Sequence, residues 1–245
     1  MKKQSKKDRG AGLSWIIGAL ILLVAAIMAG IYWKDHAEIR EVRFIGHHYT
    51  TGDELTNAIP SPVGMHPDSL HFGELIDPVV RLPWVKRADI RLEANGRMIL
   101  RITERDPIAM MVRGEKRAYT DRDGLILPVV PENPGDLPIL YGFPVTPAGD
   151  TLDSDAFRIV RDFLIAARNN EFGWTTISEV TWNEREGVVA LSHENGVKLI
   201  FGDGEFDKKF RTWEVFYAEV IRTKGIQFFE SVDLRFSNQI VAREL

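Results

Sequence analysis

The stretch GAGLSWIIGALILLVAAIMAGIYW, residues 10–33, contains no charged side chain and decides how the rest of the chain is organised. A helix of that length extends about 36 Å, enough to cross the roughly 30 Å apolar core of a bilayer. Basic residues precede it: Lys2, Lys3, Lys6, Lys7 and Arg9. Because positive charge stays in the cytoplasm, the sequence predicts a cytoplasmic tail over residues 1–11, a transmembrane helix over residues 12–33 and an extracytoplasmic remainder.

A cleaved signal peptide is the alternative interpretation of this N-terminus, since it also has a basic start followed by an apolar run. Residues 25–30, AAIMAG, are small enough to resemble a cleavage region but contain no Ala-x-Ala pattern. The apolar run is also longer than a signal peptide usually has. These features favour an uncleaved anchor in the lipid bilayer.

Composition limits what the extracytoplasmic part can do. Removing the tail leaves 26 basic and 34 acidic residues, a net charge of −8. An acidic surface is unsuited to nucleic acid, so we expect no nucleic-acid partner. The chain has no cysteine, which excludes disulfides, thiolate metal ligands and cysteine nucleophiles.

Two helices follow a short strand after the membrane segment. Residues 39–45 form a β-rich run, and Thr51-Gly52-Asp53-Glu54 matches a capping box that begins a short helix. A second helix is predicted over residues 70–82, with a break or late start at Pro78.

A hairpin completes this first region. Residues 85–92 and 98–102 have largely alternating polarity and flank Asn95-Gly96, which is a strong hairpin signal. The predicted order over residues 38–106 is therefore strand, helix, helix, strand, strand.

The second region, residues 107–245, is predicted to be a mixed β domain with flanking helices. Its strands are expected at residues 108–112, 117–120, 125–130, 177–182, 188–192, 197–201, 231–237 and 240–244. One helix begins near Ser154, and another carries an apolar stripe of Phe206, Phe210, Trp213, Tyr217 and Val220. The proline-rich residues 128–147 predict a long surface excursion. The fold class is α+β.

The sequence contains no recognisable catalytic set. His47 and His48 are adjacent, so in a strand they would point to opposite faces and could not hold one metal ion together. Asp121 and Asp123 flank an arginine before a glycine, which a turn requires for backbone reasons. A membrane-anchored hydrolase using these two carboxylates is the alternative. We therefore predict no enzyme, no cofactor and no metal site.

Gly202-Asp203-Gly204 lies between a predicted strand and a predicted helix, where glycine allows the turn and Asp203 is the expected N-cap. Lys208 and Lys209 would then occupy the first helical turn, where positive charge is mildly unfavourable. This pair is either solvated or in contact with an acidic partner.

Several motifs, in this order, resemble the FtsQ/DivIB family of bacterial cell-division proteins. The first is LPWV at residues 82–85, followed by the hairpin and by TERDPIA at residues 103–109. The later ones are DRDG at residues 121–124, LPILYG at residues 137–142 and VDLRF at residues 232–236. The resemblance implies a single N-terminal transmembrane helix, a POTRA domain over residues 38–106 and an FtsQ/DivIB-type β domain over residues 107–245.

The resemblance also implies a function. Proteins of this family are bitopic assembly factors of the inner membrane, enriched at the division septum, that bind FtsB/DivIC-like and FtsL-like proteins and recruit other septal proteins. In relatives the partner adds a strand beside the last strands of the β domain. The implied partner-binding residues are Leu234, Arg235, Phe236 and Ser237, although Leu234 and Val232 also fit a core role. Phe236 stands where the family commonly has tyrosine.

Three further residues have predicted structural roles. Trp84 is expected to anchor the core or the junction between domains, and Glu104 and Arg105 to pin that junction through charge-assisted hydrogen bonds. The alternative function is that of a POTRA-bearing assembly or secretion factor of the cell envelope.

Overall fold

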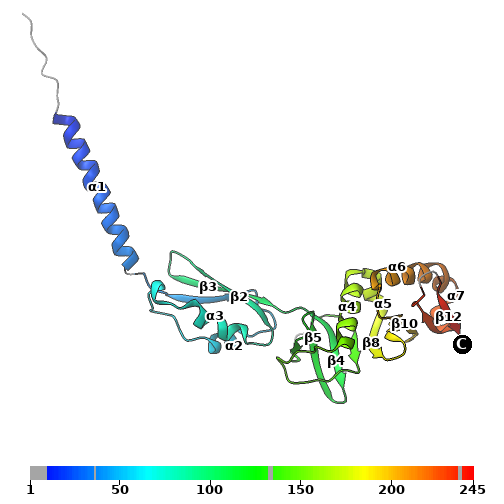
Figure 1. Cartoon of the computed structure of the whole chain (residues 1–245). Coiled ribbons are helices and arrows are strands. Elements are labelled where there is room, and N and C mark those ends of the chain that lie inside the picture. Colours follow the sequence, from blue (N-terminus) through cyan, green and yellow to red (C-terminus); the bar gives the residue numbers. More distant parts are fainter. Residues whose placement is uncertain (1–9, 36, 132–134, 237–238) are drawn as a thin grey trace, which may run out of the picture. The chain divides into compact units, whose positions relative to one another are not determined.

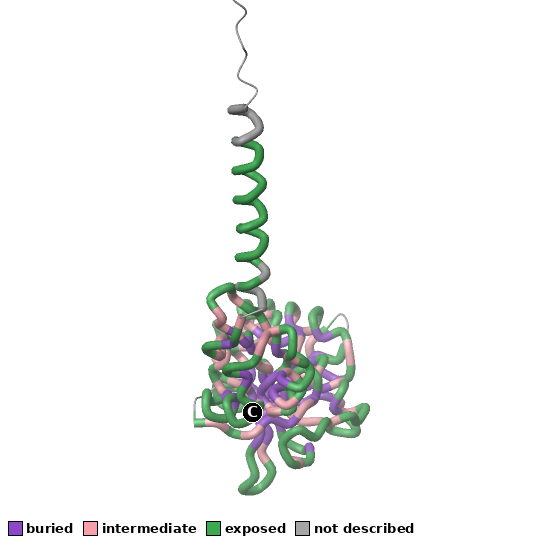
Figure 2. Tube along the Cα trace, turned by 90° about the vertical axis from the view of Figure 1, so that its left-hand side faces the viewer, coloured by how far each residue is buried: buried purple, intermediate pink, exposed green. Residues whose placement is uncertain are grey.

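The computed structural model describes residues 10–35, 37–131, 135–236 and 239–245, which form two compact units (Figure 1). The first helix, α1, covers Gly10–Asp35. Its described side chains are exposed, as Figure 2 shows by colour. Within the described residues, no helix combines the length and apolar character needed to cross a membrane. The transmembrane helix over residues 12–33 therefore stays a prediction.

The first unit contains the predicted strand, helix, helix, strand, strand order. Its elements are β1 (Glu41–Ile45), α2 (Gly52–Ala58), the 3₁₀ turn η1 (Pro67–Ser69) and most of α3 (Phe72–Val80), β2 (Val85–Leu92) and β3 (Arg97–Glu104). In the described part of the chain they form a three-stranded sheet in the order β1-β3-β2, with β1 parallel to β3. Gly96 has φ +82°, as a tight hairpin requires. Pro78 lies inside α3 and does not end it.

The second unit consists of residues 103–245 together with residues 46–51 and 80–87. Its strands are β4 (Pro107–Arg113), β5 (Lys116–Asp121), β6 (Ile126–Leu127), β7 (Ile139–Tyr141), β8 (Ile177–Asn183), β9 (Gly187–Ser192), β10 (Lys198–Gly202), β11 (Phe229–Asp233) and β12 (Val241–Glu244). Among the described residues they make one sheet in the order β12-β11-β10-β9-β8-β7-β4-β5-β6. The neighbours β4–β7, β7–β8 and β10–β11 are parallel, and the other pairs are antiparallel.

Helices pack on this sheet and close its core (Figure 1). They are α4 (Asp155–Asn169), α5 (Glu171–Thr176), α6 (Phe206–Phe216), the π-helical segment η2 (Tyr217–Ile221), α7 (Arg222–Lys224) and the 3₁₀ turn η3 (Ile226–Phe228). The helix α4 begins near Ser154, as the sequence predicts, and Ser154 caps it by accepting a hydrogen bond from the Phe157 amide. In the core, the Phe201 and Phe210 rings of β10 and α6 lie 4.9 Å apart.

Two sequence expectations were wrong, and one helix was missed. The proline-rich residues 128–147 are not only a surface excursion, because β7 lies within them and its Leu140 is buried between β4 and β8. The short helix α5 follows a new N-cap at Asn170 and was not expected. Asp203 is not the N-cap of α6; that position is Glu205, which has φ +53° and no side-chain cap.

The two edges of the large sheet differ. Outside β6, the Ile126 amide donates to the Asp150 carbonyl and the Gly149 amide donates to the Ile126 carbonyl, so residues 149–150 occupy that edge. At the other end β12 pairs with β11, and no further strand follows it in the described sheet. The outer edge of β12 is therefore open.

Candidate functional site

The open strand β12 presents two different faces. Ile240, which precedes it, and Ala242 pack against the core under the helices. Val241 and Arg243 are exposed, and Arg243 pairs with Glu230 at 2.9 Å. Because alternate residues of an edge strand leave their amides and carbonyls unpaired, β12 can bind another extended chain through its backbone.

After β11, the Arg235 side chain is held by Asp233, the last residue of that strand, and lies over Gly202 of β10. Its Nε lies 3.0 Å from Oδ1 of Asp233, and its Nη2 lies 2.6 Å from Oδ2. Burial raises the pKa of the Asp233 carboxyl, but the hydrogen bonds and charge of Arg235 outweigh it, so the pKa falls below its usual value. The pair fixes the direction of the arginine.

A glycine lies beneath Arg235 and makes this arrangement possible. Gly202, at the end of β10, has φ +76°, and a Cβ there would lie 3.1 Å from Cγ of Arg235. The same glycine forms the bulge where the register between β10 and β9 shifts opposite Gly187. A side chain at Gly202 would therefore displace Arg235.

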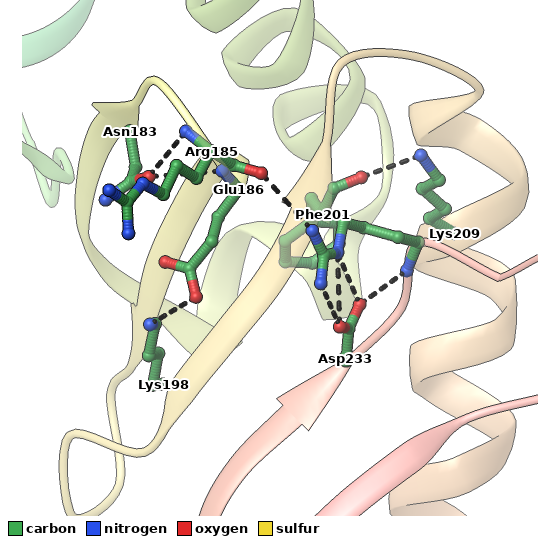
Figure 3. A network of polar contacts seen from close by, with 8 residues as sticks. Asn183, Arg185, Glu186, Lys198, Phe201, Lys209 and Asp233 are labelled. Atoms are coloured by element: carbon green, nitrogen blue, oxygen red, sulfur yellow. Dashed lines mark hydrogen bonds and ion pairs between the residues drawn. The ribbon is translucent and has the colours of Figure 1, made fainter.

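Two lysines lie near this pair, each bonded to another group (Figure 3). Lys209 donates from Nζ to the Phe201 carbonyl at 2.7 Å, and burial lowers its pKa against the opposing pull of nearby acidic groups. Lys198 pairs with Glu186 at 2.8 Å. The two adjacent lysines thus differ, because the Lys209 side chain donates a hydrogen bond to β10 and is not available to an acidic partner in the way the sequence suggested.

The predicted partner-binding residues have different environments. Phe236 is 46% exposed and its ring centre lies 6.0 Å from the Arg235 guanidinium carbon. Leu234 is only 2% exposed and Val232 is fully buried, so both belong to the core and the Leu234 side chain is not accessible to a partner. Ser237 lies outside the described residues.

Glu104 binds a run of backbone amides within the second unit. Its carboxylate accepts hydrogen bonds from the His48 amide at 2.7 Å, from Tyr49 at 3.0 Å and from Thr50 at 2.7 Å. One carboxylate thus orders three consecutive residues that are more than fifty positions away in the sequence. A role between two domains, as the sequence predicts, stays a prediction.

Arg105 pairs with a buried carboxylate of the same unit. Its Nη1 lies 2.7 Å from Oδ2 of Asp121, and the other oxygen of Asp121 accepts from the Asp123 and Leu125 amides, each at 2.9 Å. Asp123 is exposed and also pairs with Lys86 at 3.2 Å. This arrangement supports the turn role predicted for the two aspartates.

Trp84 is buried with Tyr119 and Leu127 in a small cluster of the second unit. Its ring centre lies 4.4 Å from that of Tyr49 and 6.0 Å from that of Tyr119. Trp84 is thus a buried residue of this cluster, and its predicted role as an anchor of the core or of a domain junction stays a prediction.

Sequence reasoning missed the contribution of Asp233 and Gly202 to the site. The spacing of Asp233 and Arg235, two residues apart at a strand end, was the available signal, whereas the approach of Gly202 depends on the sheet. In the described part of the chain, no group of three histidine or acidic side chains could hold a metal ion.

Comparisons with known proteins identify relatives of this chain. A family model described as "FtsQ/DivIB, C-terminal related" matches residues 106–243, which include the helices of the large sheet and all of its strands except the last residue of β12. The major extracytoplasmic domain of DivIB from Geobacillus stearothermophilus aligns with 49% of this chain and 97% of its own length, at 18% identity. Its TM-score of 0.33 is too low to support a conclusion.

Relatives with the name "Cell division protein FtsQ" match most of the chain. The one from Rhodothermus marinus is 24% identical over 86% of this chain and 80% of its own length. The one from Salinibacter ruber is 25% identical over 91% of this chain and 90% of its own length. The one from Escherichia coli is 24% identical over 96% of this chain and 85% of its own length. Because the family model covers more than half of the residues, the chain belongs to the FtsQ/DivIB family of cell-division proteins.

Proposed function

We propose that this chain is a bitopic inner-membrane protein that binds FtsB/DivIC-like and FtsL-like partners through its extracytoplasmic region and coordinates septum formation. The observation that carries the proposal is the open edge of β12, together with the exposed Phe236 in the segment that follows β11. An added strand would gain backbone hydrogen bonds from the edge and specificity from the side chains beside it.

Aromatic and arginine side chains dominate the binding energy of protein interfaces. Phe236 and Arg235 provide one of each, and the ion pair with Asp233 orients the arginine before a partner arrives. A side chain that is already ordered loses less conformational entropy on binding.

The proposed membrane anchor is α1. The large apolar side chains of Trp15, Ile16, Leu20, Leu22 and Leu23 on this helix are exposed. Lipid would cover such a surface. Alkaline carbonate washing of membranes tests the anchor: the full chain should stay in the pellet, and Leu22→Arg should shift part of it to the supernatant. Release of the unaltered chain would contradict the anchor.

The FtsQ/DivIB family acts in division without enzymatic activity, and we propose the same for this chain. The family match lies in the β domain, beyond the POTRA-like first region, and so favours division over the general assembly or secretion role. A fluorescent fusion of the full chain should therefore gather at midcell, and depletion should give filamentous cells without outer-membrane defects.

Phe236→Glu tests the binding edge. We expect the full chain in detergent micelles to bind the FtsB-like protein of the same organism, and the variant to bind at least about tenfold more weakly. Phe72→Glu is the matched control, because Phe72 is a similarly exposed phenylalanine of the first unit, at 41% against 46%. Equal affinity of Phe236→Glu and the unaltered chain in a calorimetric titration would overturn the assignment.

A further inference from the structure

A groove runs along the outer flank of α6. It has a volume of about 560 Å³, and its helical wall is formed by Lys208, Arg211, Thr212, Val215 and Glu219. These positions recur every three or four residues and so form one stripe on the helix. The opposite side of α6 faces the core, where Phe206, Phe210 and Trp213 are buried. The stripe is therefore the face of α6 that does not pack against the core.

The groove extends to the residue that precedes the open edge strand β12. Ile240 lines the groove and immediately precedes Val241, the first residue of β12. Phe216 also lines it, and its ring packs 6.0 Å from that of Phe229 on β11. Hence α6 lies over the last strands of the sheet, and its stripe borders the space beside β12.

A strand added to β12 would direct every second side chain toward this groove. Side chains of a strand alternate between the two faces of a sheet. On β12 itself Ala242 packs on the core side together with the preceding Ile240, whereas Val241 and Arg243 lie on the other face. The matching alternate side chains of an added strand would therefore meet Val215, Phe216 and Val220.

The charges at the groove favour an acidic group on the occupant. Lys208 and Arg211 lie on the stripe, and within the described residues neither side chain has an ion-pair or hydrogen-bond partner. Lys208 also lies in the first turn of α6, where a positive charge is unfavourable by itself. A carboxylate would neutralise both cations.

The helix changes geometry at the groove. Residues 217–221 are π-helical, and two of the groove residues, Glu219 and Val220, belong to this segment. A π-helical turn is rare and often occurs at functional sites.

We infer that this groove receives alternate side chains of the partner strand that adds to β12, apolar ones against Val215, Phe216 and Val220 and an acidic one at Lys208 and Arg211. This inference rests on the proposed function. It defines the partner segment by chemistry: an extended stretch with apolar residues at every second position and a carboxylate at the end that faces the two cations.

Two variants of the full chain test the inference against the FtsB-like protein of the same organism. Val215→Glu should weaken binding about tenfold or more, because it places a charge in the apolar part of the groove. The matched control is Val129→Glu, since Val129 belongs to the same unit and is 51% exposed against 54% for Val215. Both variants should melt at the same temperature as the unaltered chain.

Charge reversal tests the acidic part. Lys208→Glu combined with Arg211→Glu should weaken binding at low salt, and the loss should shrink at high salt because surface charges are screened. The control is Lys116→Glu combined with Arg117→Glu, because these two basic residues are adjacent in sequence and exposed at the start of β5. Changing the acidic residue of the partner segment to lysine should restore binding to the reversed groove.

The outcomes separate the two proposals. If Phe236→Glu loses binding while both groove variants bind like the unaltered chain, the inference is overturned and the proposed function stands. If the unaltered chain does not bind the FtsB-like protein at all, the proposed function fails and the inference fails with it.

Discussion

A Cβ atom on Gly187 would lie 2.6 Å from both the Cα and the carbonyl oxygen of Gly202, so the two backbones meet closer than any side chain allows. Gly187 also has φ +74°, in the left-handed region that favours glycine. This contact forms the bulge between β9 and β10, on which Arg235 lies.

Gly187→Ala should therefore destabilise the protein by at least about 2 kcal/mol, the sum of backbone strain and a steric clash. Gly114→Ala is the control, because Gly114 has φ +61° but no atom within 4 Å of the added Cβ. That variant should lose about 1 kcal/mol from strain alone. Urea unfolding of both variants measures the difference, and equal losses would contradict the clash.

Asp233→Asn should change how stability depends on pH. The pKa of Asp233 is lower in the folded chain than in the unfolded chain, so its ionised form stabilises the fold above about pH 4. That stabilisation is lost as the pH falls through the folded-state pKa. The variant should be about 1–2 kcal/mol less stable at pH 7, and the difference should disappear in acid.

Thermal melts between pH 7 and pH 2 measure this difference. Asp162→Asn is the control, because Asp162 is exposed and pairs only at the surface with Arg161. If the two variants follow the same pH profile, the Asp233–Arg235 pair does not stabilise the fold.

Glu104→Gln should cost about 2 kcal/mol of unfolding free energy, because an uncharged amide oxygen is a weaker acceptor for the His48, Tyr49 and Thr50 amides. Hydrogen exchange at these three amides should speed up. Glu115→Gln, in the exposed turn between β4 and β5, should change neither quantity. Unaltered exchange at residues 48–50 in Glu104→Gln would refute this role of the carboxylate.

Arg105→Ala should cost about 3 kcal/mol, because the buried Asp121 carboxylate loses its cation. Lys86→Ala is the comparison, because it breaks the ion pair between Lys86 and Asp123, in which both side chains are exposed. Surface pairs contribute about 1 kcal/mol or less. Denaturant titration of the two variants side by side measures the contrast, and similar losses would show that burial of Asp121 does not matter.

Elements set by neighbouring residues were predictable from the sequence. Asn95-Gly96 predicted the hairpin between β2 and β3, because such a turn needs particular residue types at adjacent positions. The helical spacing of apolar residues after Ser154 predicted α4. The terminal strand pair and the burial of Val232 also followed from local alternation.

Features that depend on distant parts of the chain were not predictable. β7 has three residues and is a strand only because β4 and β8 pair with it from both sides in parallel. The pairing of Arg105 with Asp121 and the approach of Arg235 to Gly202 likewise arise from the tertiary fold. No local pattern marks such contacts.

The occupied edge at β6 limits how copies of this chain can associate. A sheet with two open edges can join others end to end without limit, which is how fibres grow. Here residues 149–150 block the edge beside β6, so among the described residues pairing through the large sheet can use only β12 and joins two molecules. An exposed β12 therefore does not lead to fibres built from the large sheet.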